Sequence, residues 1–91
     1  MSTVATWLHI DGDCVLPAIR EATEKLDENV GEIILDFSSV RRLDSSTLRA
    51  IEQLASIAEN KSAKVVISGV NVDVYKVLKL VKLASRFSFV S

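Results

Sequence analysis

The run Asp44-Ser45-Ser46 is where side chains of this sequence are best placed to take part in chemistry. It follows an apolar stretch and precedes a segment whose apolar residues recur with helical spacing. Asp and Ser are good helix N-caps, and the backbone N–H groups at a helix start carry partial positive charge. A hydroxyl in this turn would be accessible to a kinase, and the helix N-terminus, with Arg41 or Arg42, would support the phosphate. The run predicts either a phosphorylation switch or simple capping of a helix.

The other reactive side chains are isolated from one another. His9 is the only histidine, it lies in an expected strand, and no G-x-S-x-G turn accompanies it. Cys14 has no cysteine or histidine close by in sequence, so we expect a buried or half-buried small residue and no metal ligand. Gly12, Gly31 and Gly69 are far apart and read as turn residues. We therefore expect no enzyme activity, no metal site and no cofactor.

Three lysines, Lys76, Lys79 and Lys82, recur at every third position of the last expected helix. Lysines in the C-terminal half of a helix interact favourably with its dipole, so a solvated face is the first interpretation. The alternative is a patch that meets lipid headgroups or an acidic partner.

Four apolar runs predict strands. They cover residues 4–10, 32–37 and 64–68, with a short extended segment at Phe87 and Phe89. In the first run Leu8 and Ile10 alternate with Trp7 and His9, which predicts opposite faces. The second run is continuously apolar from residue 33 to 35, which is typical of a strand covered on both faces.

Three helices are expected between these strands. Pro17 suits the first turn of the first helix, which residues 27–31 end. The second begins at Asp44 or Ser45 and stops near Asn60. Asp73 is expected to cap the third, and its inward residues are expected to be Val74, Val77, Leu78 and Val81. Helices that alternate with apolar strands imply mainly parallel pairing. We therefore expect one α/β domain over residues 1–91, a mixed, mostly parallel sheet of four to five strands with helices packed on it.

Composition places the chain among ordinary globular proteins. Hydrophobic residues make up 48% of it, charged residues 25%, and the net charge is −1, which does not favour nucleic acid. The single cysteine fits a reducing compartment. No apolar run approaches the roughly 20 residues that cross a bilayer, and the first residues do not resemble a signal peptide. We expect a cytoplasmic protein with no direct membrane insertion.

The stretch ILDFSSVRRLDSSTLRAIEQL, residues 34–54, resembles the signature of the STAS domain, the family of bacterial anti-sigma factor antagonists. In that family an acidic strand end and a D-S-S-G-L or D-T-A-G-L step lead into a helix. The run VVISGVNVDVYKVLKLVKLASRFSFV, residues 65–90, is similar to the family's strand, helix and closing hydrophobic segment. The resemblance implies a STAS-like fold and a non-catalytic protein-binding role in signal transduction and transcription regulation.

By this resemblance Ser45 corresponds to the serine that a partner kinase phosphorylates, and Asp44 to the acidic residue before it. Ser46, its neighbour in the turn, is the second candidate. In the family the unphosphorylated form binds a kinase-type anti-sigma factor, and phosphorylation blocks that binding. Thr47 stands where the family usually has glycine, so its side chain would restrict a partner backbone or mark a different partner.

A helix that starts at this turn places four polar residues on one stripe, namely Ser45, Arg49, Glu52 and Ser56. We predict that this stripe, together with the turn residues Asp44, Ser46 and Thr47, faces the protein partner. An ordinary solvated face is the alternative.

A second context uses the same kind of domain. The stretch VNVDVY, residues 70–75, resembles part of the STAS accessory subunit of a bacterial lipid-transport ABC transporter. There the domain would bind and stabilise the ATPase subunit, and phosphorylation would not be needed.

Overall fold

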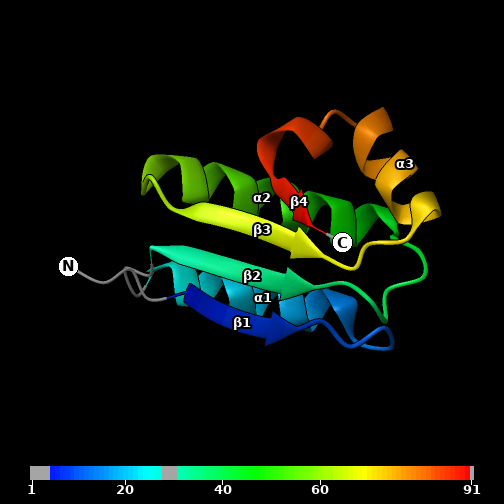
Figure 1. Cartoon of the computed structure of the whole chain (residues 1–91), viewed down its shortest axis with the longest axis horizontal. Coiled ribbons are helices and arrows are strands. Elements are labelled where there is room, and N and C mark those ends of the chain that lie inside the picture. The colour runs from blue at the N-terminus through cyan, green and yellow to red at the C-terminus, as the bar shows by residue number, and fades with distance from the viewer. Residues whose placement is uncertain (1–4, 28–30, 91) are drawn as a thin grey trace.

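A computed structural model describes residues 5–27 and 31–90 (Figure 1). The elements in chain order are β1 Ala5–His9, α1 Val15–Asp27, β2 Glu32–Asp36, α2 Ser45–Asn60, β3 Lys64–Ser68, α3 Val72–Leu80, the 3-10 turn η1 Ala84–Arg86 and β4 Ser88–Val90. The expected alternation of strands and helices is confirmed. Residue 4, expected to begin the first strand, and residues 28–30, expected in the turn after the first helix, lie outside the described residues.

The described strands form one sheet in the order β1-β2-β3-β4, and every neighbouring pair is parallel. The expectation of a mostly parallel sheet of four to five strands is confirmed with four described strands, and the one difference is that the sheet is parallel throughout instead of mixed. Each described strand reaches the next through a helical connection, which returns the chain to the same end of the sheet. Figure 1 shows α1 and α2 together behind the sheet, so both crossovers pass over the same face.

The core lies between that face and the helices. The side chains that point into it from the strands and strand ends are Leu8, Ile10, Ile33, Leu35, Phe37, Val65 and Ile67. The expected alternation in the first strand is confirmed, because Trp7 and His9 are exposed on the opposite side. The expectation of a second strand covered on both faces is wrong for Ile34. It is half-buried and lies beside Trp7 and Val66, on the face that α1 and α2 do not cover.

Helix α2 contributes a wide buried stripe: Thr47, Ala50, Ile51, Leu54, Ala55 and Ala58. Three of these six are alanines, and small side chains let α2 approach its neighbours closely. Helix α1 adds Ile19, Ala22 and Leu26 to the same core. In residues 5–27 and 31–90 no helix is both long enough and apolar enough to span a membrane.

The start of α3 differs from the expectation. Asn71, not Asp73, is the N-cap, and its Oδ1 accepts a hydrogen bond from the Val74 backbone N–H at 2.7 Å. Val74 and Leu78 are buried as expected, whereas Val77 and Val81 are exposed. The physical reason is that α3 packs on the domain through one narrow stripe, so residues on its flanks remain outside the core.

Loops after β1, β2 and β3 meet at the carboxyl edge of the sheet because the strands are parallel. Gly12 lies against the loop after β2, where an added β-carbon would stand 2.1 Å from the Ser39 carbonyl oxygen. The Asn71 Nδ2 group donates to the Val40 carbonyl at 2.9 Å. The sequence marked Gly12 as a turn residue, but the close approach to a distant loop required the fold.

Polar contacts also join β1 to the end of β2. The Asp36 carboxylate accepts from the Ser38 backbone N–H at 3.0 Å and from His9 Nδ1 at 3.0 Å. Hydrogen bonds from the Ser38 hydroxyl and backbone, followed by that of His9, lower the pKa of Asp36 to about 2. These contacts hold the start of the loop that leads to α2.

Gly12→Ala is expected to destabilise the fold by about 1–3 kcal/mol, because the new methyl group would overlap the Ser39 carbonyl and force the two loops apart. Urea unfolding would measure the change. Asp13→Ala, in the exposed part of the same loop, is the matched control and should change stability by less than about 0.5 kcal/mol. Equal stability of the two variants would contradict the close packing of these loops.

Acid should weaken the fold through Asp36. Its pKa is about 2 in the folded state and near 3.8 in the unfolded chain, so its contribution is present above pH 4 and is lost as the pH falls toward 2. Allowing for solvent screening, the loss should be about 1–2 kcal/mol. Asp36→Asn should show a shallower decline in unfolding free energy over that interval. Parallel curves for the variant and the wild type would refute the assignment.

Candidate functional site

The start of α2 is fixed by one hydrogen bond. Asp44 is extended, with φ −96° and ψ 176°, and its Oδ1 accepts from the Thr47 backbone N–H at 2.8 Å. The backbone N–H of Thr47 is the main cause that lowers the pKa of Asp44, and its hydroxyl adds to the effect. Asp44 is therefore a capping residue and is ionised at neutral pH.

Ser45 is the first residue of α2, and it is exposed together with Ser46. The Thr47 and Leu48 backbone N–H groups bond to Asp44, through its carboxylate and its carbonyl. Within the described part of the chain, the N–H groups of Ser45 and Ser46 have no protein acceptor. The turn thus presents two hydroxyls beside two unpaired backbone donors, a combination that suits an anion.

Thr47 faces the opposite way. Its side chain is 4% exposed, and it is the only buried polar residue of the described chain. The Thr47 side chain was expected to lie on the partner surface, whereas it is buried in the domain, because two residues after Ser45 the helix has turned inward. The sequence contains a signal for the burial of Thr47. It lies four residues before Ile51 and seven before Leu54, so the helical period places all three on one apolar stripe.

The predicted stripe is on the surface, because Ser45, Arg49, Glu52 and Ser56 are all exposed. Its far end makes a contact that the sequence did not indicate. Arg86 of η1 donates to the Ser56 hydroxyl at 3.3 Å. The same guanidinium donates twice to the Glu59 carboxylate, at 2.8 Å each. Ser56 already has an internal partner, and Glu52 interacts electrostatically with the same Arg86, so Ser45 and Arg49 are the part of the stripe that Arg86 does not engage.

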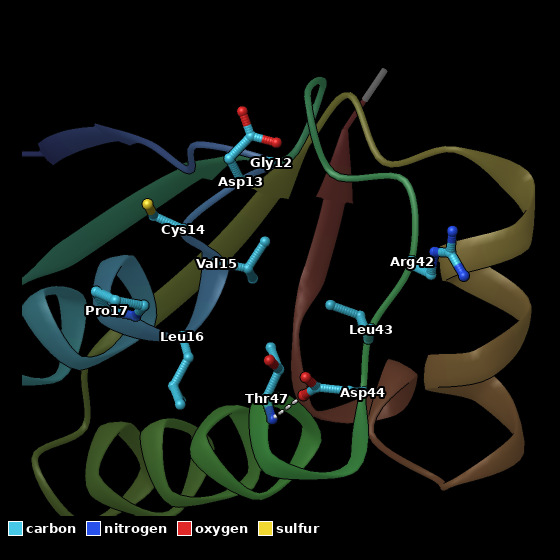
Figure 2. Close-up of a pocket in the computed structure, with 10 residues that line it drawn as sticks. All are labelled: Gly12, Asp13, Cys14, Val15, Leu16, Pro17, Arg42, Leu43, Asp44 and Thr47. Carbon is cyan, nitrogen blue, oxygen red and sulfur yellow. Dashed lines mark hydrogen bonds between the residues drawn. The ribbon is translucent and has the colours of Figure 1, made fainter.

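Beside the turn lies a hollow of about 340 Å³ between the loop after β1 and the start of α2 (Figure 2). Val15 and Leu16 line one side of it, and Leu43 and Thr47 line the other. Cys14, at its rim, is exposed, so the expected burial of this residue is wrong. It stands in the turn just before α1, where its side chain lies outside the core.

Arg42 was expected to support a phosphate at this turn, but its side chain is not directed toward the turn (Figure 2). Figure 2 shows its side chain pointing away from the Asp44 carboxylate. Arg49, one helical turn after Ser45, lines a small surface hollow together with Ser46. Arg20 of α1 lines the same hollow, so two cations, Arg20 and Arg49, lie near Ser46.

One arrangement near the site was missed by sequence reasoning. His9 Nδ1 donates to Asp36, and its Nε2 lies 3.5 Å from the Ser39 hydroxyl. The order Asp-His-Ser is that of serine hydrolases. The His9–Ser39 distance is at the outer limit of a hydrogen bond and the His9 side chain is 56% exposed, so water competes for both groups. We interpret the three residues as a structural contact that joins the end of β1 to the end of β2 and to the loop after it.

Comparison with known proteins gives a family for the whole arrangement. The family model described as the STAS domain matches residues 4–91, nearly the whole chain. Among curated proteins, no match is found. STAS domains are generally non-catalytic binding or regulatory modules that mediate protein–protein interactions. The described residues form four parallel strands and three α-helices, which is consistent with the STAS fold. Because the family model covers nearly all of its length, the chain belongs to the STAS domain family.

Proposed function

We propose that this STAS domain is a regulatory protein-binding module, similar to an anti-sigma factor antagonist, that is switched by phosphorylation of Ser45. The supporting observation is the exposed Ser45 hydroxyl at the first residue of α2, beside backbone N–H groups that have no acceptor in the described chain. A kinase can reach such a hydroxyl without unfolding the domain.

Phosphorylation would change the charge of this surface more than its shape. A phosphoserine carries between about −1.5 and −2 charges at neutral pH. The Asp44 carboxylate next to it is already ionised, as its lowered pKa indicates. The free N–H groups at the helix start would hold the phosphate in place, so α2 should persist. A partner whose surface suits the neutral hydroxyl would then meet close to three negative charges.

The partner surface consists of Asp44, Ser45, Ser46, Arg49 and Glu52, which are all exposed. Arg49 and Glu52 have opposite charges one turn apart, and this alternation favours a polar, charge-matched partner over an apolar groove. The proposed partner is a cytoplasmic anti-sigma factor with serine kinase activity. Ser56 lies at the margin because Arg86 occupies its hydroxyl.

The ATPase subunit of a lipid-transport ABC system is the competing partner. The resemblance of residues 70–75 to its STAS accessory subunit is what favours it. In that setting the same surface would bind constitutively, with no phosphate. The two functions therefore differ in how the complex responds to charge at Ser45.

Ser45→Asp is expected to weaken binding to the anti-sigma kinase of the same organism by about tenfold or more, since like charges at an interface cost several kcal/mol. Ser45→Ala should bind as the wild type does. Isothermal titration calorimetry against the kinase, and separately against the ABC ATPase, would give the affinities.

Thermal unfolding is the control, because an added carboxylate at a helix start should leave stability equal or slightly higher. Ser45→Asp that binds the kinase as tightly as the wild type would reject the switch. Tight binding to the ATPase by both Ser45 variants would support the transporter function instead.

Arg49→Ala and Glu52→Ala should each weaken partner binding by roughly fivefold to thirtyfold, the usual range for a useful interface side chain. Their melting temperatures should stay near that of the wild type, because both side chains are exposed. Glu24→Ala, at an exposed position of α1, is the matched control for binding. Loss of stability in step with loss of affinity would exclude these residues as contacts.

A further inference from the structure

Helix α3 carries an exposed face that neither the core nor the proposed switch uses. Val72, Lys76, Lys79 and Leu80 are spaced at i, i+4, i+7 and i+8, so they share one side of the helix. Val72 is 66% exposed and Leu80 is 83% exposed. Figure 1 shows α3 at the periphery of the domain, away from α1 and β1. Two large aliphatic side chains and two lysines thus face outward together.

The described residues place no ion-pair partner beside the lysines of this region. In residues 5–27 and 31–90, no carboxylate lies within salt-bridge distance of Lys76, Lys79 or Lys82. Asp73 is the one acidic residue on the helix. The chain as a whole has a formal charge of −1, so this positive patch is local and is not part of a general basic surface.

A shallow hollow adjoins this face, between α3 and η1. It has a volume of about 390 Å³ and is lined by Tyr75, Lys79, Lys82, Ala84 and Ser85. Two ammonium groups and two hydroxyls around one hollow are donors of the kind that a phosphate group requires. The aliphatic side chain of Leu80 stands next to Lys79 in the sequence and is directed outward with it.

We propose that this face of α3, together with Lys82 just beyond the helix, docks the domain on an anionic phospholipid surface, with headgroup phosphates near Lys79 and Lys82 and with Val72 and Leu80 inserted among the lipids. This contact departs from the expectation of no direct membrane insertion. Lysine is depleted at protein–protein interfaces, whereas helices that lie on membranes combine lysines with exposed aliphatic residues. The charge of the patch is complementary to anionic headgroups. Binding is peripheral and reversible, because the contact involves one short helix of nine residues.

The test is cosedimentation of the full chain with vesicles. Vesicles of phosphatidylcholine containing about one-third phosphatidylglycerol should bind the protein, and pure phosphatidylcholine vesicles should not. Higher salt should reduce binding, because it screens the lysines. Free inorganic phosphate at the same ionic strength should not release the protein, which distinguishes a membrane surface from a site for a soluble phosphate.

Two variants examine the two parts of the patch. Lys79→Glu should lower the partition coefficient by about fivefold or more, since each lysine near an anionic surface contributes roughly that factor. Leu80→Ser should lower it by about tenfold through lost insertion. Arg20→Glu, a matched charge reversal at an exposed position of α1, should bind as the wild type does. All these positions are exposed, so circular dichroism should report an unchanged fold.

Equal binding to neutral and anionic vesicles, or equal losses in Lys79→Glu and Arg20→Glu, would overturn the proposal. If the wild type ignored both kinds of vesicle and Leu80→Ser instead weakened a protein complex, the face would be a protein interface and the proposal would fail. None of these outcomes bears on Ser45, so the lipid proposal and the switch stand or fall separately.

Discussion

The hydrogen bond from the Thr47 backbone N–H to the Asp44 carboxylate determines how this domain presents its surface. It sets the first residue of α2 at Ser45, and the helical period then fixes every later position. Thr47 and Ile51 turn into the core, while Ser45 and Arg49 turn to solvent. The buried stripe of α2 sets which side of the helix faces the core, and the cap starts the helix where Ser45 lies on the solvent side. The capping carboxylate therefore serves stability and site geometry together.

The cap is held in place by loops that are distant in sequence. Parallel strands bring the segments after β1, β2 and β3 to one edge, where Gly12 packs on Ser39 and Asn71 donates to Val40. The turn at Asp44–Ser46 is thus supported by the carboxyl edge of the sheet, while the hydroxyls of Ser45 and Ser46 are exposed to solvent. A charge added there alters what a partner meets without disturbing the core. The exposed face of α3 is a separate surface, made of aliphatic and basic side chains.

Much of this arrangement could be predicted from periodicity and capping. The element order, the cap region at residues 44–45 and the exposure of Ser45 follow from local patterns. What could not be predicted depends on contacts between segments far apart in the chain. Asn71, and not Asp73, caps α3, and its side chain also donates a hydrogen bond to the Val40 carbonyl in a distant loop. Arg86 donates a hydrogen bond to Ser56, which lies 30 residues earlier in the chain. The exposure of Val77 depended on how narrowly α3 packs, which no local pattern encodes.

The central claim is that charge on Ser45 controls association, and authentic phosphoserine tests it most directly. Protein carrying phosphoserine only at residue 45 can be prepared by genetic incorporation and titrated into the proposed partner, an anti-sigma factor with kinase activity, beside the unmodified chain. The account predicts at least about a tenfold higher Kd for the phosphorylated form, with both forms equally folded. Equal affinity of the two forms for that partner would contradict it.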